Sequence, residues 1–381
     1  MHVICQQRHL AQNLAAITHA LGSKQYTLPI LTHVLLSAEE PGTLHLFATN
    51  LEIGIALQLD AEILEPGKIA LPAKLLHEIV QNFSEVRVEL CVPEDSTTAR
   101  LSTIHTKTSL RGMDAAEFPK LPERDEAALP IVFGATQLKE YIGQVAFAAG
   151  TDDGRPVLQG ISVQLREEEV TLAASDAIRL AVRREKREVN EEEPALSDIL
   201  IPARSMIELA RILPAEGEVT MTISLDRTRV HFQAPKLAMV SRLIEGIFPP
   251  FQSLIPATYT TRAVLDRAEF AAAIKSVALF AEAHVMVLTI KEADSDLGNG
   301  TLLLDSAKED LGDSESILDA SVEGPPIQIR FGTKYLLDAL DAMNTPTVAL
   351  ETTTHQKPGI LRPVGELASP QFHVIMPMNK L

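Results

Sequence analysis

Three cationic residues recur at a fixed interval along the chain. Lys74, Arg204 and Lys334 are spaced 130 residues apart. Each is followed four residues later by a carboxylate: Glu78, Glu208 or Asp338. A cation and a carboxylate at this spacing share one helix face, and pairing there is worth only about 0.3–0.5 kcal/mol. A cation in the first helical turn also opposes the helix dipole. Its threefold repetition therefore suggests a use beyond such pairing.

Catalytic and cofactor-binding motifs do not accompany these cations. The chain contains no GxxxxGK[ST], GxGxxG, HExxH, CxxC or GxSxG motif. Segment 294–305 begins like a calcium loop, with Asp294 and Asp296, but has Asn299 at the glycine position and Asp305 at the final position. A turn is the better interpretation. The histidines show no metal-ligand spacing. We expect no metal and no cofactor, and an enzyme stays a minor alternative because missing motifs argue only weakly against catalysis.

The cations lie in segments with the apolar period of an amphipathic helix. One series comprises residues 71–83, 201–213 and 331–343. A second series comprises residues 8–21, 137–149 and 269–281, in which Leu10, Leu138 and Phe270 are 128 and 132 residues apart. Agreement of two helical series within two residues makes chance a poor explanation, so a repeat of about 130 residues is predicted.

Alternating apolar runs separate the helical segments. Residues 43–59, 169–185 and 218–234 are each typical of two strands joined by a polar turn. The connections are too short for parallel crossovers, which predicts antiparallel sheets. The expected fold class is α+β, with three similar domains at 1–124, 125–258 and 259–381, each with two helices packed on antiparallel sheet.

Composition limits the cellular setting and the partners. The two cysteines, Cys5 and Cys91, exclude a disulfide framework and fit a reducing cytoplasm. The start "MHVICQQRHL" lacks the pattern of a signal peptide, and no apolar run approaches the roughly 20 residues of a membrane span. We therefore expect a cytoplasmic protein with no membrane partner.

The net charge of −17 argues against a nucleic-acid partner when taken for the whole molecule. Its distribution weakens that objection. The six helical segments, with the fifth extended back to include Asp266 and Arg267, together carry a charge of +1, from eight cations and seven carboxylates, so the excess of acid lies in strands and loops. The helices thus present long cations on a nearly neutral background.

The sequence resembles the bacterial beta sliding clamps, the processivity subunits of DNA polymerase III, along its whole length. The motifs that carry the resemblance, in chain order, are "TLPILTHVLL" (27–36), "LFATNLEIGIAL" (46–57), "LPAKLLHEIV" (71–80), "GMDAAEFPKLP" (112–122), "GRPVLQGISVQL" (154–165), "ASDAIRLAV" (174–182), "SRLIEGIFPPF" (241–251) and "VIMPMNKL" (374–381). Their order and spacing make the match specific.

The resemblance implies a head-to-tail dimeric ring around duplex DNA, with helices lining the hole and sheets outside. Contacts to phosphates would be independent of sequence and weak enough to permit sliding. The cations implied to face DNA are Arg8, Lys24, Lys74, Lys139, Arg204, Arg211, Arg267, Lys275 and Lys334.

The resemblance also implies an apolar cleft between the second and third domains. It would capture short linear motifs of the replicative polymerase, the clamp loader and repair proteins. The deep pocket would use Leu180, Pro249, Leu254, Val374 and Met376. The flanking groove would use Leu158, Ser175, Arg179, Tyr335, Pro377 and Met378.

Two further expectations concern the groove and the dimer. Ala177 and Ile178 stand where the family usually has glycine followed by an aromatic residue or histidine, which predicts a different peptide preference. Leu110 and Leu279 are the apolar candidates for the contact between the first domain of one chain and the third domain of the other. The alternative function is an acidic three-repeat scaffold that binds proteins and does not encircle DNA.

Overall fold

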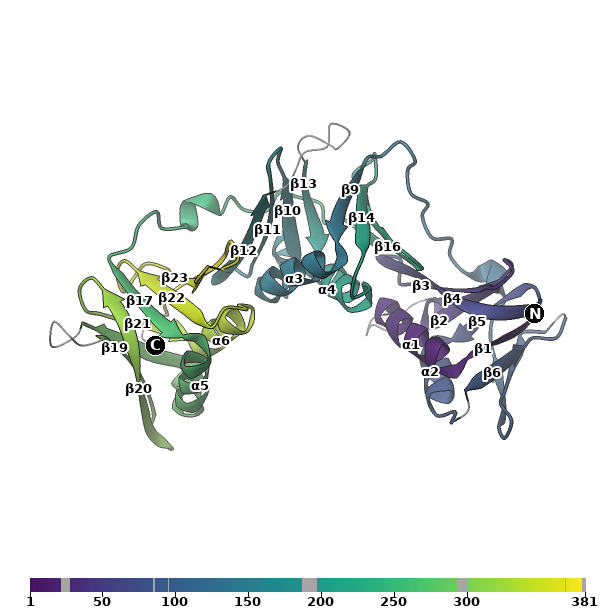
Figure 1. The fold of residues 1–381 in the computed structure, drawn as a ribbon, viewed down its shortest axis with the longest axis horizontal. Coiled ribbons are helices and arrows are strands. Elements are labelled where there is room, and N and C mark those ends of the chain that lie inside the picture. The colour runs from purple at the N-terminus through teal and green to yellow at the C-terminus, as the bar shows by residue number, and fades with distance from the viewer. Residues whose placement is uncertain are drawn as a thin grey trace. The chain divides into compact units, whose positions relative to one another are not determined.

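The computed structural model describes residues 1–21, 28–84, 86–94, 96–186, 197–292, 300–366 and 368–378. The chain divides into two units, which we call the N-terminal unit (Met1–Lys139 with Ser205–Leu243) and the C-terminal unit (Glu140–Arg204 with Ile244–Leu381). Each unit is built on a largely antiparallel sheet with helices against it (Figure 1). No helix in the described part of the chain is long and apolar enough to span a membrane.

The sheet of the N-terminal unit runs in the order β8-β7-β6-β1-β4-β16-β15-β14-β9, and β3, β2 and β5 continue from β4. Its strands are β1 (His2–Gln6), β2 (His33–Ala38), β3 (Thr43–Thr49), β4 (Ile53–Glu65), β5 (Gly67–Pro72), β6 (Arg87–Cys91), β7 (Thr98–Ser102), β8 (Lys107–Arg111), β9 (Pro130–Gly134), β14 (Glu218–Ile223), β15 (Arg229–Ala234) and β16 (Leu237–Arg242). The expected antiparallel pairing is confirmed throughout this sheet.

The sheet of the C-terminal unit runs in the order β13-β10-β11-β12-β24-β23-β22-β17-β20-β19-β18-β21. Its strands are β10 (Gly160–Leu165), β11 (Glu169–Ser175), β12 (Arg179–Lys186), β13 (Ser197–Pro202), β17 (Thr261–Asp266), β18 (Val285–Lys291), β19 (Gly300–Lys308), β20 (Gly312–Glu323), β21 (Ile327–Gly332), β22 (Thr347–Thr352), β23 (Gly359–Val364) and β24 (Gln371–Ile375). These strands also pair antiparallel.

All six predicted helical segments form helices. They are α1 (Gln7–Thr18), α2 (Ala73–Gln81), α3 (Ala135–Val145), α4 (Ala203–Ile212), α5 (Arg267–Val277) and α6 (Thr333–Asp341). In Figure 1, α1 lies beside α2 and α5 beside α6, each pair against its sheet. Leu10, Leu14 and Ile17 of α1 are buried, as the apolar period predicts.

The starts of the first helical series differ from the prediction. Leu71–Pro72 and Ile201–Pro202 are the last residues of β5 and β13 rather than helical turns. A residue before proline is disfavoured in the helical region and adopts an extended conformation. The helices therefore begin one residue after each proline. The second series ends in short 3-10 turns, such as η1 (His19–Leu21) and η7 (Ala278–Phe280).

The expected middle domain is divided between the two units, because strand pairing continues beyond its predicted limits. Its strand β16 pairs with β4 of the first repeat, and its strand β12 pairs with β24 of the third. The division at 124 and 258 stays a prediction. The core of the C-terminal unit is mainly aliphatic, with Phe270 and Phe331 fully buried within it.

Candidate functional site

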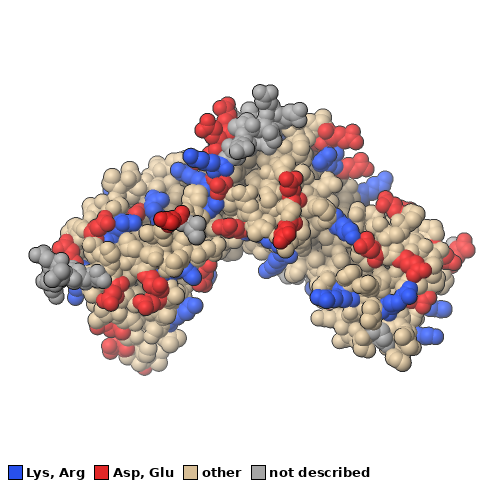
Figure 2. All heavy atoms as spheres, in the orientation of Figure 1, with Lys and Arg blue, Asp and Glu red and all other residues tan. Residues whose placement is uncertain are grey.

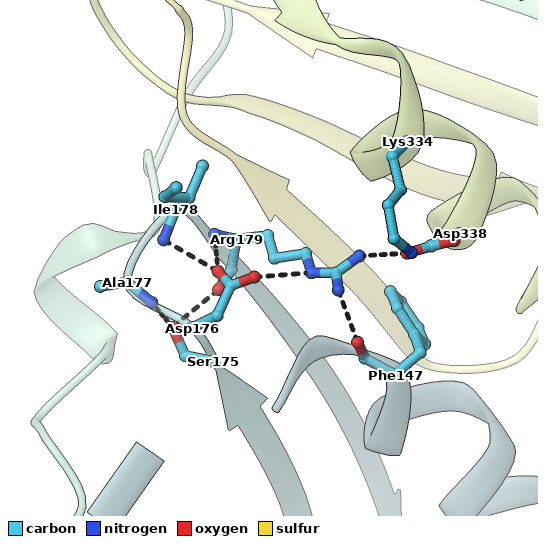
Figure 3. Close-up of polar contacts among 8 residues, drawn as sticks. All are labelled: Phe147, Ser175, Asp176, Ala177, Ile178, Arg179, Lys334 and Asp338. Atoms are coloured by element: carbon cyan, nitrogen blue, oxygen red, sulfur yellow. Dashed lines mark hydrogen bonds and ion pairs between the residues drawn. The ribbon is translucent and has the colours of Figure 1, made fainter. Parts of the chain in front are cut away.

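A tight turn between β11 and β12 is the centre of the predicted partner-peptide residues. The Ser175 hydroxyl donates to the carbonyl of Arg179 at 2.7 Å and accepts from the amide of Ala177 at 3.1 Å. The Asp176 carboxylate accepts from the amides of Ile178 and Arg179, each at 2.9 Å. Ala177 has a φ of 76°, a left-handed value that favours glycine. The turn is thus fixed by side-chain acceptors on both sides of a strained residue (Figure 3).

The Arg179 side chain is almost fully enclosed beneath this turn, with 9% of its surface exposed. Its Nε donates to Asp176 at 3.0 Å and its Nη1 to Asp338 of α6 at 2.5 Å. Its Nη2 donates to the carbonyl of Phe147 at 2.7 Å. Figure 3 shows the guanidinium between these three acceptors. Since a buried charge is stable only when paired, Arg179 joins β12 to α6 and holds the turn in place.

Aromatic rings complete the surroundings of Arg179. Its guanidinium carbon lies 5.2 Å from the ring centre of Phe147 and 5.1 Å from that of Tyr335. Both distances suit cation–π contact. Lys334 donates to the same Asp338 oxygen at 2.6 Å. Arg179 and Lys334, predicted for two different sites, therefore share one carboxylate. No local pattern in the sequence indicates this link, because 159 residues separate Arg179 from Asp338.

An apolar cluster lies on β12 and β24 beside the turn. Leu180 pairs in register with Val374, and both pack with the buried Phe251. Phe248 and Ile255 pack against the same cluster. Sequence reasoning missed these three residues, although the apolar run around Pro249 and Pro250 was the available signal. Leu254 and Met376 remain 55% and 40% exposed, and Pro249 is also exposed. The described residues thus offer a partly open apolar surface.

The remaining groove residues lie on neighbouring elements of the C-terminal unit. Leu158 is buried in the 3-10 turn η5 (Pro156–Gln159). The amide of Met376 donates to the carbonyl of Ile178 at 2.8 Å, and that of Met378 donates to the carbonyl of Arg330 at 2.9 Å. Main-chain bonds therefore hold the chain end on either side of Pro377.

The chain matches three family models in order: the N-terminal, central and C-terminal domains of the DNA polymerase III beta subunit, at residues 1–122, 133–250 and 252–379. The chain belongs to the DNA polymerase III beta subunit family. A beta sliding clamp of Streptomyces coelicolor is 30% identical over 100% of this chain and 99% of its own length. One from Synechocystis sp. is 29% identical over 100% and 99%.

Solved clamp structures share the fold. A DNA polymerase sliding clamp from Bacillus subtilis is similar with a TM-score of 0.90 and 27% identity, over 100% of both chains. A sliding clamp from Pseudomonas aeruginosa bound to griselimycin has a TM-score of 0.89 and 23% identity over 100% of both chains. The three-domain clamp fold predicted from the sequence is therefore confirmed.

The helix cations expected from the clamp family differ in their surroundings. Arg8, Lys74, Arg204 and Lys275 are exposed, Lys139 is half-buried, and these five form no ion pair with the described residues. Three others are engaged within the chain: Arg211 with Glu208 at 2.9 Å, Lys334 with Asp338, and Arg267 with the carbonyls of Thr345 and Leu340. Lys24 lies outside the described residues, as do Asp294, Asp296 and Asn299.

Charged side chains of both signs are spread over the visible face of each unit (Figure 2).

The two residues predicted as apolar dimer contacts differ in exposure. Leu110 on β8 is 6% exposed in the single chain, whereas Leu279 is 73% exposed. Leu110 therefore already belongs to a core, and Leu279 alone of the pair is free for contact with a partner.

His373 of β24 is a buried neutral group next to this site. It is 2% exposed, its ring centre lies 5.3 Å from that of Phe147, and neither ring nitrogen has a hydrogen-bond partner among the described residues. Burial, with a smaller contribution from the charge of Arg179, lowers the pKa of His373 to about 3. A buried imidazole without partners costs stability.

We predict that His373→Phe removes an acid-dependent loss of stability. The unfolded state takes up a proton on His373 below its ordinary pKa of 6.5, whereas the folded state does so only near 3. Stability due to this group is therefore complete above pH 6.5 and falls as the pH is lowered. Between pH 6.5 and pH 5 the wild type should lose about 2 kcal/mol more than the variant.

Denaturant unfolding of both proteins at several pH values measures this difference. The pKa values of His33 and His231 are also lowered by burial, but both residues are present in both proteins and cancel. The same dependence of the free energy of unfolding on pH in the two proteins would contradict the prediction.

Proposed function

We propose that this chain is a DNA sliding clamp: a homodimeric ring that encircles duplex DNA and tethers the replicative polymerase to it. The observation that carries the proposal is the ordered match to all three domains of the beta subunit family over residues 1–379. The clamp loader and repair proteins would use the same apolar site through short linear motifs. The protein would act in the cytoplasm, without a cofactor, as a processivity subunit with no catalytic step of its own.

Exposed cations on repeated helices support the DNA-binding part of the proposal. Arg8, Lys74, Arg204 and Lys275 extend from helices whose opposite faces are buried against sheet. Such side chains can reach phosphates without base contacts, which gives sequence-independent and salt-sensitive binding. An acidic protein scaffold that does not bind DNA would have no need for cations at equivalent positions of successive repeats, so we disfavour that alternative.

Strand edges support the dimeric part. Within the chain, successive repeats join by antiparallel pairing of β4 with β16 and of β12 with β24. By position in the repeat, β8 corresponds to β16 and β24, and β20 to β4 and β12. Among the described residues β8 pairs only with β7, and β20 pairs only with β19 over 312–320. Two such edges on separate copies can complete the same junction head to tail.

Charge complementarity favours this pairing. The exposed face of β8 carries Lys107 and Arg111. The exposed face of β20 carries Asp313, Glu315 and Asp319. Opposite charges on neighbouring strands stabilise an antiparallel pair and disfavour pairing of like edges. Ile317 is 64% exposed in the single chain, and the partner strand would bury part of its side chain.

We predict that the protein remains on closed circular DNA and leaves linear DNA by sliding off its ends, because a ring without tight contacts is retained only by topology. The protein is loaded on nicked circles, passed over a gel-filtration column, and compared before and after cleavage of the circle. Equal retention on circular and linear DNA, or no retention on either, would contradict the ring.

A charge exchange tests the dimer edges. Lys107→Glu with Arg111→Glu, and separately Glu315→Lys with Asp319→Lys, should each weaken self-association by at least about tenfold, since like charges then face each other. Mixing the two variants should restore the dimer, because both junctions again join opposite charges. Light scattering should give about one chain mass of 41.5 kDa for each variant and twice that for the mixture.

Lys291→Glu, an exposed cation on β18 outside these edges, is the control and should stay dimeric. Dimers of unchanged strength in both double variants would rule out this junction, even if the protein is a ring.

We predict that Met376→Asp abolishes binding of a polymerase-tail peptide while the dimer persists. Met376 lies beside the apolar cluster and is 40% exposed, so a bound peptide would bury the new charge. An unpaired buried charge costs several kcal/mol, which corresponds to roughly a hundredfold or greater loss of affinity. Val86→Asp, at an exposed aliphatic position outside the site, is the matched control. Fluorescence anisotropy measures the affinity of both variants for the labelled peptide. Unchanged affinity of Met376→Asp would refute the assignment of Met376 to the peptide site.

A further inference from the structure

The turn beneath the predicted peptide site has a near copy in the N-terminal unit. Between β3 and β4, the Thr49 hydroxyl donates to the carbonyl of Ile53 at 2.9 Å and accepts from the amide of Leu51 at 3.0 Å. The Asn50 amide oxygen accepts from the amides of Glu52 and Ile53 at 2.9 and 2.7 Å. Leu51 has a φ of 71°. Residue by residue, this is the bonding of the turn at 175–179.

The neighbouring strand is also placed in the same way. The amide of Arg242 donates to the carbonyl of Glu52 at 2.8 Å. In the C-terminal unit, the amide of Met376 donates to the carbonyl of Ile178 in the same way. Val240 pairs with Gly54 in the register in which Val374 pairs with Leu180. The N-terminal unit therefore has a second junction with the same backbone. In it Arg242 takes the place of Met376, and Gly54 that of Leu180.

These two replacements change what the junction can bind. A Cβ atom on Gly54 would lie 2.4 Å from Cδ2 of Leu121, so the chain's own Leu121 occupies the space that a larger side chain would fill. The deep apolar position is thus closed from within. A groove of about 310 Å³ remains beside it, lined partly by Leu51, Pro119 and Val240.

The groove is cationic although the chain is strongly acidic. Lys120, Arg229 and Arg242 line it, against the single carboxylate of Glu52. Arg229 forms a long ion pair with Asp226, with 3.9 Å between Nη1 and Oδ2. Lys120 and Arg242 form no ion pair with any described residue. A net positive groove on a protein of net charge −17 favours an anionic ligand.

We propose that this junction groove is a second docking site, which binds a short acidic peptide segment of a partner protein. Its volume suits a few side chains, and its apolar floor, including Leu51 at 52% exposure, suits aliphatic residues between the acidic ones. A phosphate backbone would use the cations but not the floor, so the peptide is favoured over nucleic acid. The site goes beyond the proposed clamp function and uses the apolar site only as a structural comparison.

The test uses a fluorescein-labelled hexapeptide of alternating Glu and Leu, with a Lys and Leu analogue as the charge-inverted probe. The full-length protein should bind the acidic probe, with affinity that falls as salt rises, and should not bind the analogue. Lys120→Glu combined with Arg242→Glu should weaken binding by at least about tenfold. Lys291→Glu, with a charge change of the same sign outside the groove, should leave it unchanged.

Two further measurements separate this inference from the proposed function. Met376→Asp should leave acidic-probe binding intact, and the double groove variant should leave polymerase-tail peptide binding intact. Failure of the unmodified protein to bind the polymerase-tail peptide, with the acidic probe still bound, would count against the proposed function alone. Failure of the acidic probe to bind, unchanged affinity of the double variant with an unchanged unfolding temperature, or displacement of the probe by a short DNA duplex would each overturn the second site.

Discussion

Main-chain pairing between successive repeats positions the two candidate sites of this protein. In the C-terminal unit β24 continues the sheet of β12, and in the N-terminal unit β16 continues that of β4. Each strand pair satisfies backbone donors and acceptors that would otherwise form an exposed edge. It also brings together residues that are far apart in sequence, such as Leu180 and Val374. The apolar site exists because this pairing places a chain end beside a turn from the preceding repeat.

The turn at each junction needs support that the strands alone do not provide. Ala177 and Leu51 both adopt positive φ values, which carry a cost for residues other than glycine. An acidic or amide side chain, Asp176 or Asn50, accepts two amide protons and offsets that cost. At the apolar site Arg179 adds a link to α6 through Asp338. The apolar Ile53 occupies the equivalent position in the N-terminal unit and cannot form this ionic link.

The distribution of charge follows the division between helices and strands. The helical segments are nearly neutral, and carboxylates prevail in the strands and loops. The two strand edges of the proposed dimer junction also differ in charge, with Lys107 and Arg111 exposed on β8 and carboxylates exposed on β20. A net charge of −17 opposes nonspecific attachment of DNA, so attraction of an anionic partner would require local groups of cations.

The sequence by itself determined the repeat, the α+β class, all six helices and the family. These features follow from local periodicity and from the order of motifs, both of which can be read directly along the amino-acid sequence. It did not determine where the first helical series begins, since Pro72 and Pro202 extend the preceding strands. It also placed Arg179 in a groove, whereas only the tertiary structure revealed that its donors are bound to Asp176, Asp338 and Phe147. Those partners lie up to 159 residues away, and no local pattern records which distant residues a sheet will bring together.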